Sequence, residues 1–201
     1  MLLDADESQL VLVDYQSRLM PSIHEAELVL RNAQRLGRIA QLLDVPVWGT
    51  EENTQGLGEN VAEVKTLCAR TLSKQHFSGV ADGLVEWLRP PAPPQRGGNA
   101  RSLPKHLQKP APEQESRNTI VIAGCEAHVC LLQTALDLLE EEFEVWVVTD
   151  ACSSRTERNR DAAFDRLAGA GAELVTTEMV AFEWLRTAEH PAFKEVLALV
   201  K

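Results

Sequence analysis

Three short apolar segments constrain the fold of this chain more than any other feature. Residues 9–15 (QLVLVDY), 119–124 (TIVIAG) and 143–149 (FEVWVVT) are each close to a continuous apolar run of strand length. A strand without a polar face is buried on both sides, as strands are in a parallel sheet between two layers of helices. These segments therefore predict an α/β protein built on a parallel sheet.

The rest of the chain alternates helical patterns with weaker strand patterns. Apolar residues at helical spacing predict helices over about 22–43, 81–88, 130–141, 157–168, 179–187 and 191–200. Further short strands are expected at 45–50, 69–78 and 172–176. This alternation predicts a Rossmann-like, open parallel sheet of about six strands with helices on both faces.

One segment, residues 89–117, interrupts the alternation. It contains seven of the ten prolines of the chain, together with Gly97 and Gly98. It is too polar and too rich in proline for a core, so we interpret it as a surface insertion in a single domain of residues 1–201. A proline-rich motif that binds a partner is the less favoured alternative.

Charge and composition restrict the partners of the protein. The 201 residues include 20 Lys and Arg against 30 Asp and Glu, a formal net charge of −10. Nucleic-acid binding draws its affinity from basic patches, so we expect no nucleic-acid partner. No run of 18 apolar residues is present and the first residues are acidic. We therefore expect no membrane span and no signal peptide, but a cytoplasmic protein whose four cysteines are free thiols.

Three reactive side chains lie at or just beyond predicted strands. Asp14 ends the first strand, Lys74 lies near the end of the third, and Cys130 is expected to open the helix after residues 119–124. Ligands of open α/β sheets bind beyond the carboxyl ends of the strands, so the fold could bring these residues together. A helix start and a nearby lysine would favour the thiolate, with the aspartate as base. Taken singly, each residue has a simpler structural explanation.

Four further residues are candidates for contact with a substrate. Gln16 could orient Asp14 or hold a polar group, Trp48 and Glu51 could contact substrate at the end of the second strand, and Phe77 could line the pocket. For Trp48 and Phe77, a packing role is equally plausible. Residues 48–58 contain no histidine, so we expect no metal site there and no cofactor.

Two other features carry weaker functional interpretations. His128 lies two residues before Cys130 and could be a base, although a loop histidine is the simpler explanation. Residues 152–158 have the C-x5-R spacing of a cysteine phosphatase loop but lack the glycines that usually surround the phosphate. A helix cap at Ser153 or Ser154 explains this segment better.

The separated aspartate, lysine and cysteine, in this order, resemble the isochorismatase-like cysteine hydrolases. The matching stretches span nearly the whole chain: VLVDYQSRL (11–19), PVWGTEENTQGLG (46–58), LSKQHFS (72–78), IAGCEAHVCLLQTALDLL (122–139) and VVTDACSSR (147–155). The segments GCEAHVC, DACSSR and HPAFKEVLALVK are most similar to the metal-free isochorismatase domain-containing proteins. The proline-rich segment has no counterpart in the family pattern.

The resemblance implies a catalytic triad of Asp14, Lys74 and Cys130. It also implies a cis peptide between Cys125 and Glu126, and an oxyanion hole formed by the backbone N–H groups of Glu126 or Ala127 and of Cys130. A homo-oligomer that acts on a small-molecule substrate is a further implication.

The cysteine favours amide or other acyl chemistry, because the enzyme that gives the family its name lacks it and cleaves a vinyl ether. We therefore expect a small-molecule hydrolase that cleaves an amide or related C–N bond through a thioester on Cys130. The alternatives are a non-catalytic scaffold or interaction protein with a vestigial pocket, and a nuclease, a name given to some relatives. The net charge of −10 disfavours the nuclease.

Overall fold

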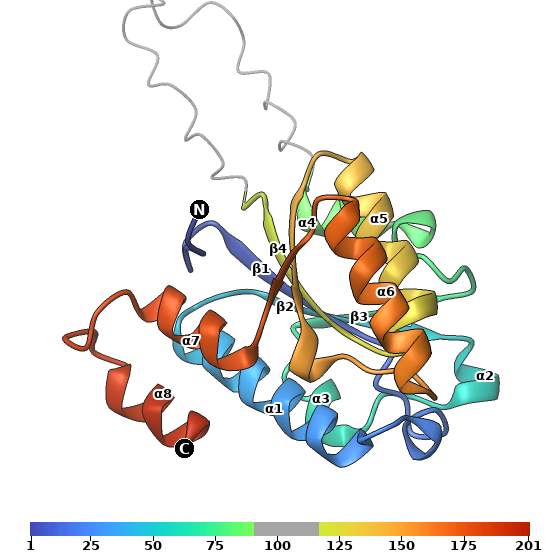
Figure 1. The fold of residues 1–201 in the computed structure, drawn as a ribbon, viewed down its shortest axis with the longest axis horizontal. Helices are drawn as coiled ribbons and strands as arrows, with labels where there is room; N and C mark the ends of the chain where they lie inside the picture. Colours follow the sequence, from blue (N-terminus) through green and yellow to red (C-terminus); the bar gives the residue numbers. More distant parts are fainter. Residues whose placement is uncertain (91–116) are drawn as a thin grey trace, which may run out of the picture.

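Six parallel strands form one sheet at the centre of the computed structural model, which describes residues 1–90 and 117–201 (Figure 1). The strands are β1 (Ser8–Val13), β2 (Val47–Glu52), β3 (Arg70–Lys74), β4 (Thr119–Gly124), β5 (Glu144–Val148) and β6 (Glu173–Val175). Their order is β3-β2-β1-β4-β5-β6, and every neighbouring pair is parallel. The prediction of a Rossmann-like parallel sheet is confirmed. The expected insertion at 89–117 lies, apart from its ends, outside the described residues.

Helices cover both faces of the sheet (Figure 1). One face carries α1 (Ala26–Leu42), α7 (Thr177–Leu185) and α8 (Phe193–Val200), and the other carries α5 (Leu132–Glu140) and α6 (Glu157–Gly169). The shorter elements are α2 (Thr54–Leu57), α3 (Ala62–Lys65), α4 (Leu84–Leu88), the 3-10 helices η1 (Met20–Ser22), η2 (Val80–Asp82) and η5 (Thr149–Ala151), and the π-helical turn η4 (Ala127–Leu131). Among the described helices, none is both long and apolar enough to cross a membrane.

The two central strands explain the apolar runs of the sequence. Every residue of β1 and of β4 is buried, and the two strands pair in register from Ser8 and Thr119 to Val13 and Gly124. Because helices cover both sides of these strands, neither strand can carry a polar face. Chain segments more than 100 residues apart thus form the middle of the core.

The site-forming boundaries differ from the sequence prediction in two places. β2 continues past Thr50 to Glu52, because Glu51 and Glu52 pair in register with Ser73 and Lys74 of β3. The helix expected to begin at Cys130 begins earlier, with the π-helical turn η4, so Cys130 is the fourth residue of that turn.

The carboxyl ends of β1 and β4 approach each other closely. A Cβ atom built on Gly124 would lie 2.2 Å from the carbonyl oxygen of Val13, so no side chain fits there. The Cys125 N–H donates to the same oxygen at 3.0 Å, and the following peptide bond, between Cys125 and Glu126, is cis. At this point the chain order of the sheet reverses direction, which is where ligands of such sheets bind.

Candidate active site

Asp14, Lys74 and Cys130 meet at the carboxyl edge of the sheet. Asp14 follows β1, Lys74 ends β3, and Cys130 lies in η4 after β4. One oxygen of Asp14, one oxygen of Glu52 and Sγ of Cys130 all lie within 4.8 Å of one another. Oδ2 of Asp14 lies 2.8 Å from Nζ of Lys74. The sheet therefore brings together a thiol, an ammonium group and two carboxylates from distant parts of the chain.

The thiol and the two carboxylates line a pocket of about 320 Å³. Its lining residues are Asp14, Arg18, Leu19, Ser22, Glu52, Leu57, Phe77, Glu126, Val129, Cys130 and Arg155. Small-molecule sites are concave and combine apolar walls with a few polar groups, as this one does.

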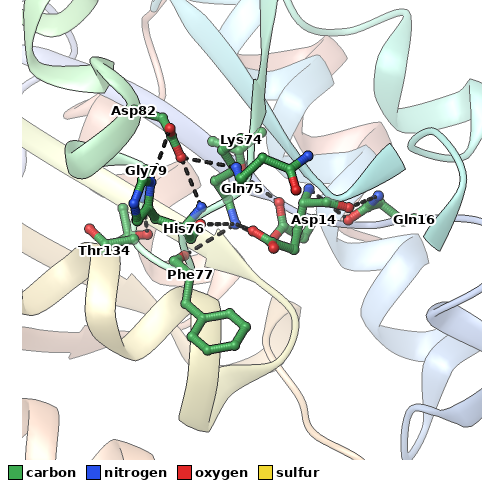
Figure 2. Close-up of polar contacts among 12 residues, drawn as sticks. Asp14, Gln16, Lys74, Gln75, His76, Phe77, Gly79, Asp82 and Thr134 are labelled. Carbon is green, nitrogen blue, oxygen red and sulfur yellow. Dashed lines mark hydrogen bonds and ion pairs between the residues drawn. The ribbon is translucent and has the colours of Figure 1, made fainter. Parts of the chain in front are cut away.

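Lys74 is a buried cation rather than a solvated surface charge. Its side chain is 1% exposed, and Nζ lies 2.8 Å from both Asp14 Oδ2 and Glu52 Oε2. Nζ also donates to the carbonyl oxygens of His76 (3.3 Å) and Phe77 (3.1 Å); Figure 2 shows the ammonium among these acceptors. Burial alone would lower the pKa of Lys74, but the surrounding anionic groups, Asp14 first, raise the pKa above its ordinary value. Lys74 is therefore charged.

The two carboxylate oxygens of Asp14 have different partners. Oδ1 accepts a 2.6 Å hydrogen bond from Oγ1 of Thr50, and the Asp14 N–H donates to the Thr50 carbonyl at 3.2 Å. Oδ2 pairs with Lys74 by charge but receives no hydrogen bond of good geometry from the described residues. The backbone of Asp14 has a φ of 52°, a left-handed conformation that non-glycine residues adopt mainly at special sites. Asp14 is thus fixed at Oδ1 by the Thr50 hydroxyl and at Oδ2 by the charge of Lys74.

The surroundings of Cys130 raise the pKa of its thiol, contrary to the expectation of a stabilised thiolate. Burial raises the pKa of Cys130, the Asp14 carboxylate raises it further, and Lys74 acts in the opposite direction with less effect. The correction has a structural cause: Cys130 does not open its helix, and two carboxylates rather than one lie beside it. A thiol in this setting needs a base to become a nucleophile.

The backbone around Cys130 narrows the choice of oxyanion donors. The Ala127 N–H donates to the Ser153 carbonyl at 2.8 Å, so Ala127 is not available. The Glu126 N–H has no hydrogen-bond acceptor among residues 1–90 and 117–201. Of the two alternatives left open by the sequence, Glu126 is the one whose N–H is free.

Gln16 contacts Glu52 rather than Asp14 or a substrate. Its Oε1 accepts from the Glu52 N–H at 2.9 Å, and its Nε2 donates to the carbonyl oxygens of Glu52 (2.8 Å) and Gly58 (2.5 Å). The side chain is fully buried. Gln16 therefore fixes the end of β2 and is a positioning residue.

Trp48 and Glu51 lie outside the pocket, so their expected contact with substrate is not supported by their placement. The Trp48 indole lies near the amino end of β2 and donates to Oε1 of Gln9 at 2.9 Å. Glu51 points to the opposite face of the strand from Glu52, because side chains alternate along a strand. Its carboxylate accepts a hydrogen bond from the Asn60 N–H at 2.8 Å. Phe77 does line the pocket and is 52% exposed.

The sequence analysis missed Glu52 and two arginines. Glu52 lies two residues after Thr50 on the same strand, and side chains two residues apart in a strand lie on the same face. This alternation is the sequence signal that could have identified Glu52. Arg155 binds Oε2 of Glu126 through its backbone N–H (3.1 Å) and Nε (2.9 Å), and Arg18 donates to two carbonyl oxygens of α2. His128, by contrast, lies outside the pocket, with Nδ1 2.9 Å from Oγ of Ser154.

Asp14, Glu52 and Cys130 also have the ligand types and spacing of a metal site. However, the Lys74 ammonium lies 2.8 Å from an oxygen of each carboxylate. It already supplies the positive charge that a metal ion would bring, and it would repel such an ion. These residues therefore fit an ion-paired cluster better than a metal centre.

Comparison with known proteins gives consistent matches. Residues 103–179 match the family model of the isochorismatase domain. The chain is 35% identical to mouse isochorismatase domain-containing protein 2A over 98% of this chain and 84% of the mouse protein. The human isochorismatase domain-containing protein 2 is 35% identical over 96% of this chain and 83% of the human protein.

Solved structures show the same fold. The MAR1 ribonuclease of Caenorhabditis elegans has a TM-score of 0.83 and 29% identity, covering 100% of this chain and 92% of that one. Escherichia coli YcaC, described as an octameric hydrolase of unknown specificity, has a TM-score of 0.78 and 24% identity, covering 98% of this chain and 95% of that one.

Proposed function

The chain belongs to the isochorismatase family, and on this premise we propose that it is a small-molecule cysteine hydrolase that cleaves an amide or related C–N bond. The observation that carries the proposal is that Asp14 and Cys130, from distant parts of the chain, line one pocket, and that Lys74 forms a buried ion pair with Asp14. Nucleophilic catalysis needs a thiol, a base within reach and a group that holds the base, and these three side chains supply them.

In the first half of the proposed reaction, the Cys130 thiol transfers its proton to Oδ2 of Asp14 as the sulfur attacks the substrate carbonyl carbon. The N–H groups of Glu126 and Cys130 bind the resulting oxyanion. Asp14 then passes the proton to the leaving nitrogen, the C–N bond breaks, and the amine or ammonia departs. The product of this half is a thioester on Cys130.

In the second half, Asp14 takes a proton from a water molecule, which attacks the thioester. The oxyanion forms again at the same N–H groups, the C–S bond then breaks, and Asp14 returns its proton to the departing sulfur. The carboxylic acid product dissociates and the thiol is restored. Throughout, Lys74 keeps the Asp14 carboxylate in place and offsets the negative charge that develops at sulfur.

A panel of small amides, scored by release of ammonia or amine, tests the proposal. Turnover should fall by at least about 10³-fold in Cys130→Ala, since a nucleophile cannot be replaced by binding alone. Cys68→Ala is the matched control, because Cys68 is also a free, partly buried thiol but contacts the carbonyl oxygen of Val64 away from the pocket. Full turnover by Cys130→Ala on a confirmed substrate would refute the mechanism.

A scaffold with a vestigial pocket is the second candidate, and the same protein distinguishes it. A vestigial site would cleave none of the amides, and substitution of Asp14 would leave the reactivity of Cys130 towards alkylating agents unchanged. The intact ion pair between Asp14 and Lys74 favours the enzyme. For the ribonuclease named in the C. elegans relative, the net charge of −10 is unfavourable, and RNA degradation that survives Cys130→Ala would point there instead.

We also propose that the protein is a homo-oligomer, as the E. coli YcaC structure is an octamer. Light scattering coupled to gel filtration measures this directly. A mass equal to that of a single chain at micromolar concentration would contradict it.

A further inference from the structure

Glu52 lines the pocket, and one of its carboxylate oxygens has no hydrogen-bond partner among residues 1–90 and 117–201. Its Oε2 is taken by Lys74 at 2.8 Å. Its Oε1 receives no hydrogen bond from the residues that the structure describes, although Glu52 lines the pocket. An ionised carboxylate oxygen only accepts hydrogen bonds, so a donor group of a bound ligand can pair with it.

Glu52 cannot easily move away from this position. The Gln16 amide holds both its N–H and its carbonyl, at 2.9 and 2.8 Å. Strand pairing with β3 places it in register with Lys74. The free oxygen is therefore preorganised, as binding groups of active sites must be.

The Glu52 carboxylate also lies close to the reacting centre. One Glu52 oxygen, one Asp14 oxygen and the Cys130 sulfur lie within 4.8 Å of one another. A carbonyl carbon in position for attack lies roughly 3–3.5 Å from the sulfur. The leaving nitrogen, which is bonded to that carbon, then comes within hydrogen-bond reach of the carboxylates.

We propose that Glu52 accepts a hydrogen bond from an N–H of the scissile group, and that the site therefore takes primary or secondary amides and ureido compounds rather than esters or tertiary amides. The inference rests on the proposed hydrolase function and specifies its substrate class. Asp14 and Glu52 would then divide the work: Asp14 moves the proton, and Glu52 holds the nitrogen that receives it.

The charges of the cluster support a donor rather than an acceptor at this place. Two carboxylates and one ammonium leave an excess of one negative charge. An ester would turn a lone pair of its oxygen towards the anionic oxygen of Glu52, and an N,N-dimethyl amide would turn a methyl group towards it. Neither can donate a hydrogen bond, so the Glu52 oxygen would stay unpaired. Sites built to bind an N–H or O–H reject analogues that lack it by about 10⁴-fold or more.

The test uses Glu52→Gln with a primary amide, its N,N-dimethyl amide and the methyl ester of the same acyl group. Lys74 requires an acceptor, so the Gln carbonyl turns to Lys74 and its NH₂ group faces the pocket. We expect kcat/KM for the primary amide to fall by about 10²-fold or more, while kcat/KM for the ester holds or rises. Glu52→Asp, which keeps the charge but withdraws the oxygen, should lose amide activity in the same selective way.

Glu51→Gln is the matched control, because Glu51 is the neighbouring residue of the same type and its carboxylate binds the Asn60 N–H outside the pocket. It should leave the amide-to-ester ratio of wild type. A measurement without substrate complements these: Glu52→Gln should move alkylation of Cys130 to lower pH, since the Glu52 carboxylate raises the pKa of that thiol.

Equal losses on the amide and the ester in Glu52→Gln would overturn the proposal and reduce Glu52 to a support for Lys74. A wild-type enzyme that prefers the ester or the dimethyl amide would overturn it as well. These outcomes differ from failure of the hydrolase proposal itself, in which no acyl compound is cleaved or Cys130→Ala retains turnover.

Discussion

Glu52 and Lys74 are register partners at the carboxyl ends of adjacent parallel strands, and their side-chain tips lie 2.8 Å apart. The same ammonium lies 2.8 Å from Asp14. One lysine thus forms ion pairs with two buried carboxylates, one at the end of β2 and one just after β1. This arrangement makes Lys74 the centre of the site in both the structural and the electrostatic sense.

Removing Lys74 should therefore damage stability as well as activity. Lys74→Met leaves two buried carboxylates without a cation, and we expect a loss of about 3–5 kcal/mol in the free energy of unfolding, measured with urea. In Lys65→Met the partners Glu51 and Glu59 lose a half-exposed lysine, and the loss should stay below about 1 kcal/mol. If both variants were equally stable, the buried cluster would not depend on Lys74 as described.

When Asp14 is neutralised, the Cys130 thiol should become more reactive towards alkylating agents while the rate of hydrolysis falls. The Asp14 carboxylate raises the pKa of Cys130, so in Asp14→Asn the thiolate forms at lower pH. Alkylation by iodoacetamide, followed against pH and corrected with Cys130→Ala, should shift to lower pH. Hydrolysis should fall by about 10²–10⁴-fold, because the base is gone. An unchanged pH profile of alkylation would show that the Asp14 carboxylate does not affect the pKa of the Cys130 thiol.

Thr50 should act as a positioning residue for Asp14. Its hydroxyl donates to Oδ1 at 2.6 Å, and Thr50→Val removes this bond while keeping the shape of the side chain. A hydrogen bond to a charged group contributes about 1.5–3 kcal/mol, so kcat should drop by about tenfold or more. Thr50→Ser keeps the donor and should restore most of the rate. Equal rates for the Val and Ser variants would exclude this role.

Gly124 should be intolerant of any side chain. A Cβ atom there would lie 2.2 Å from the Val13 carbonyl oxygen and 2.6 Å from the Val13 Cβ, so β1 and β4 would have to separate. We expect Gly124→Ala to lose about 1–3 kcal/mol or more in thermal or urea unfolding. Gly169→Ala in α6 is the control, since its Cβ would meet nothing within 4 Å and alanine favours a helix. A neutral Gly124→Ala would contradict the close approach.

Much of the fold could be read from the sequence because its main determinants are local. Residues 9–15, 119–124 and 143–149 are apolar throughout, and burial on both faces is the arrangement that satisfies such strands. Asp14, Lys74 and Cys130 were found because they lie at or beyond strand ends, where ligands of parallel sheets bind.

The details of the site depended on contacts that no local pattern carries. The sequence predicts that the second strand ends at Thr50, so Glu51 and Glu52 fall in a loop. In a strand, alternate side chains point to opposite faces, which would have distinguished Glu52 from Glu51, but this rule does not apply to a loop. Gln16 was expected to orient Asp14 or to hold a polar group of the substrate, but it binds the backbone of Glu52, a residue brought close only by the pairing of β1 with β2. The cytoplasmic location, the single domain and the interpretation of the proline-rich segment stay predictions.

The pairing of β1 with β4 has a consequence for how activity arises during folding. Asp14 and Lys74, the proposed base and its cation, lie before residue 90, and Cys130, the proposed nucleophile, lies after residue 117. The proposed reaction centre is therefore complete only after β1 has paired with β4, a non-local contact of the kind that forms slowly. If the proposed function holds, turnover reports completed folding, because a nascent chain with only its first three strands contains Asp14 and Lys74 but not Cys130.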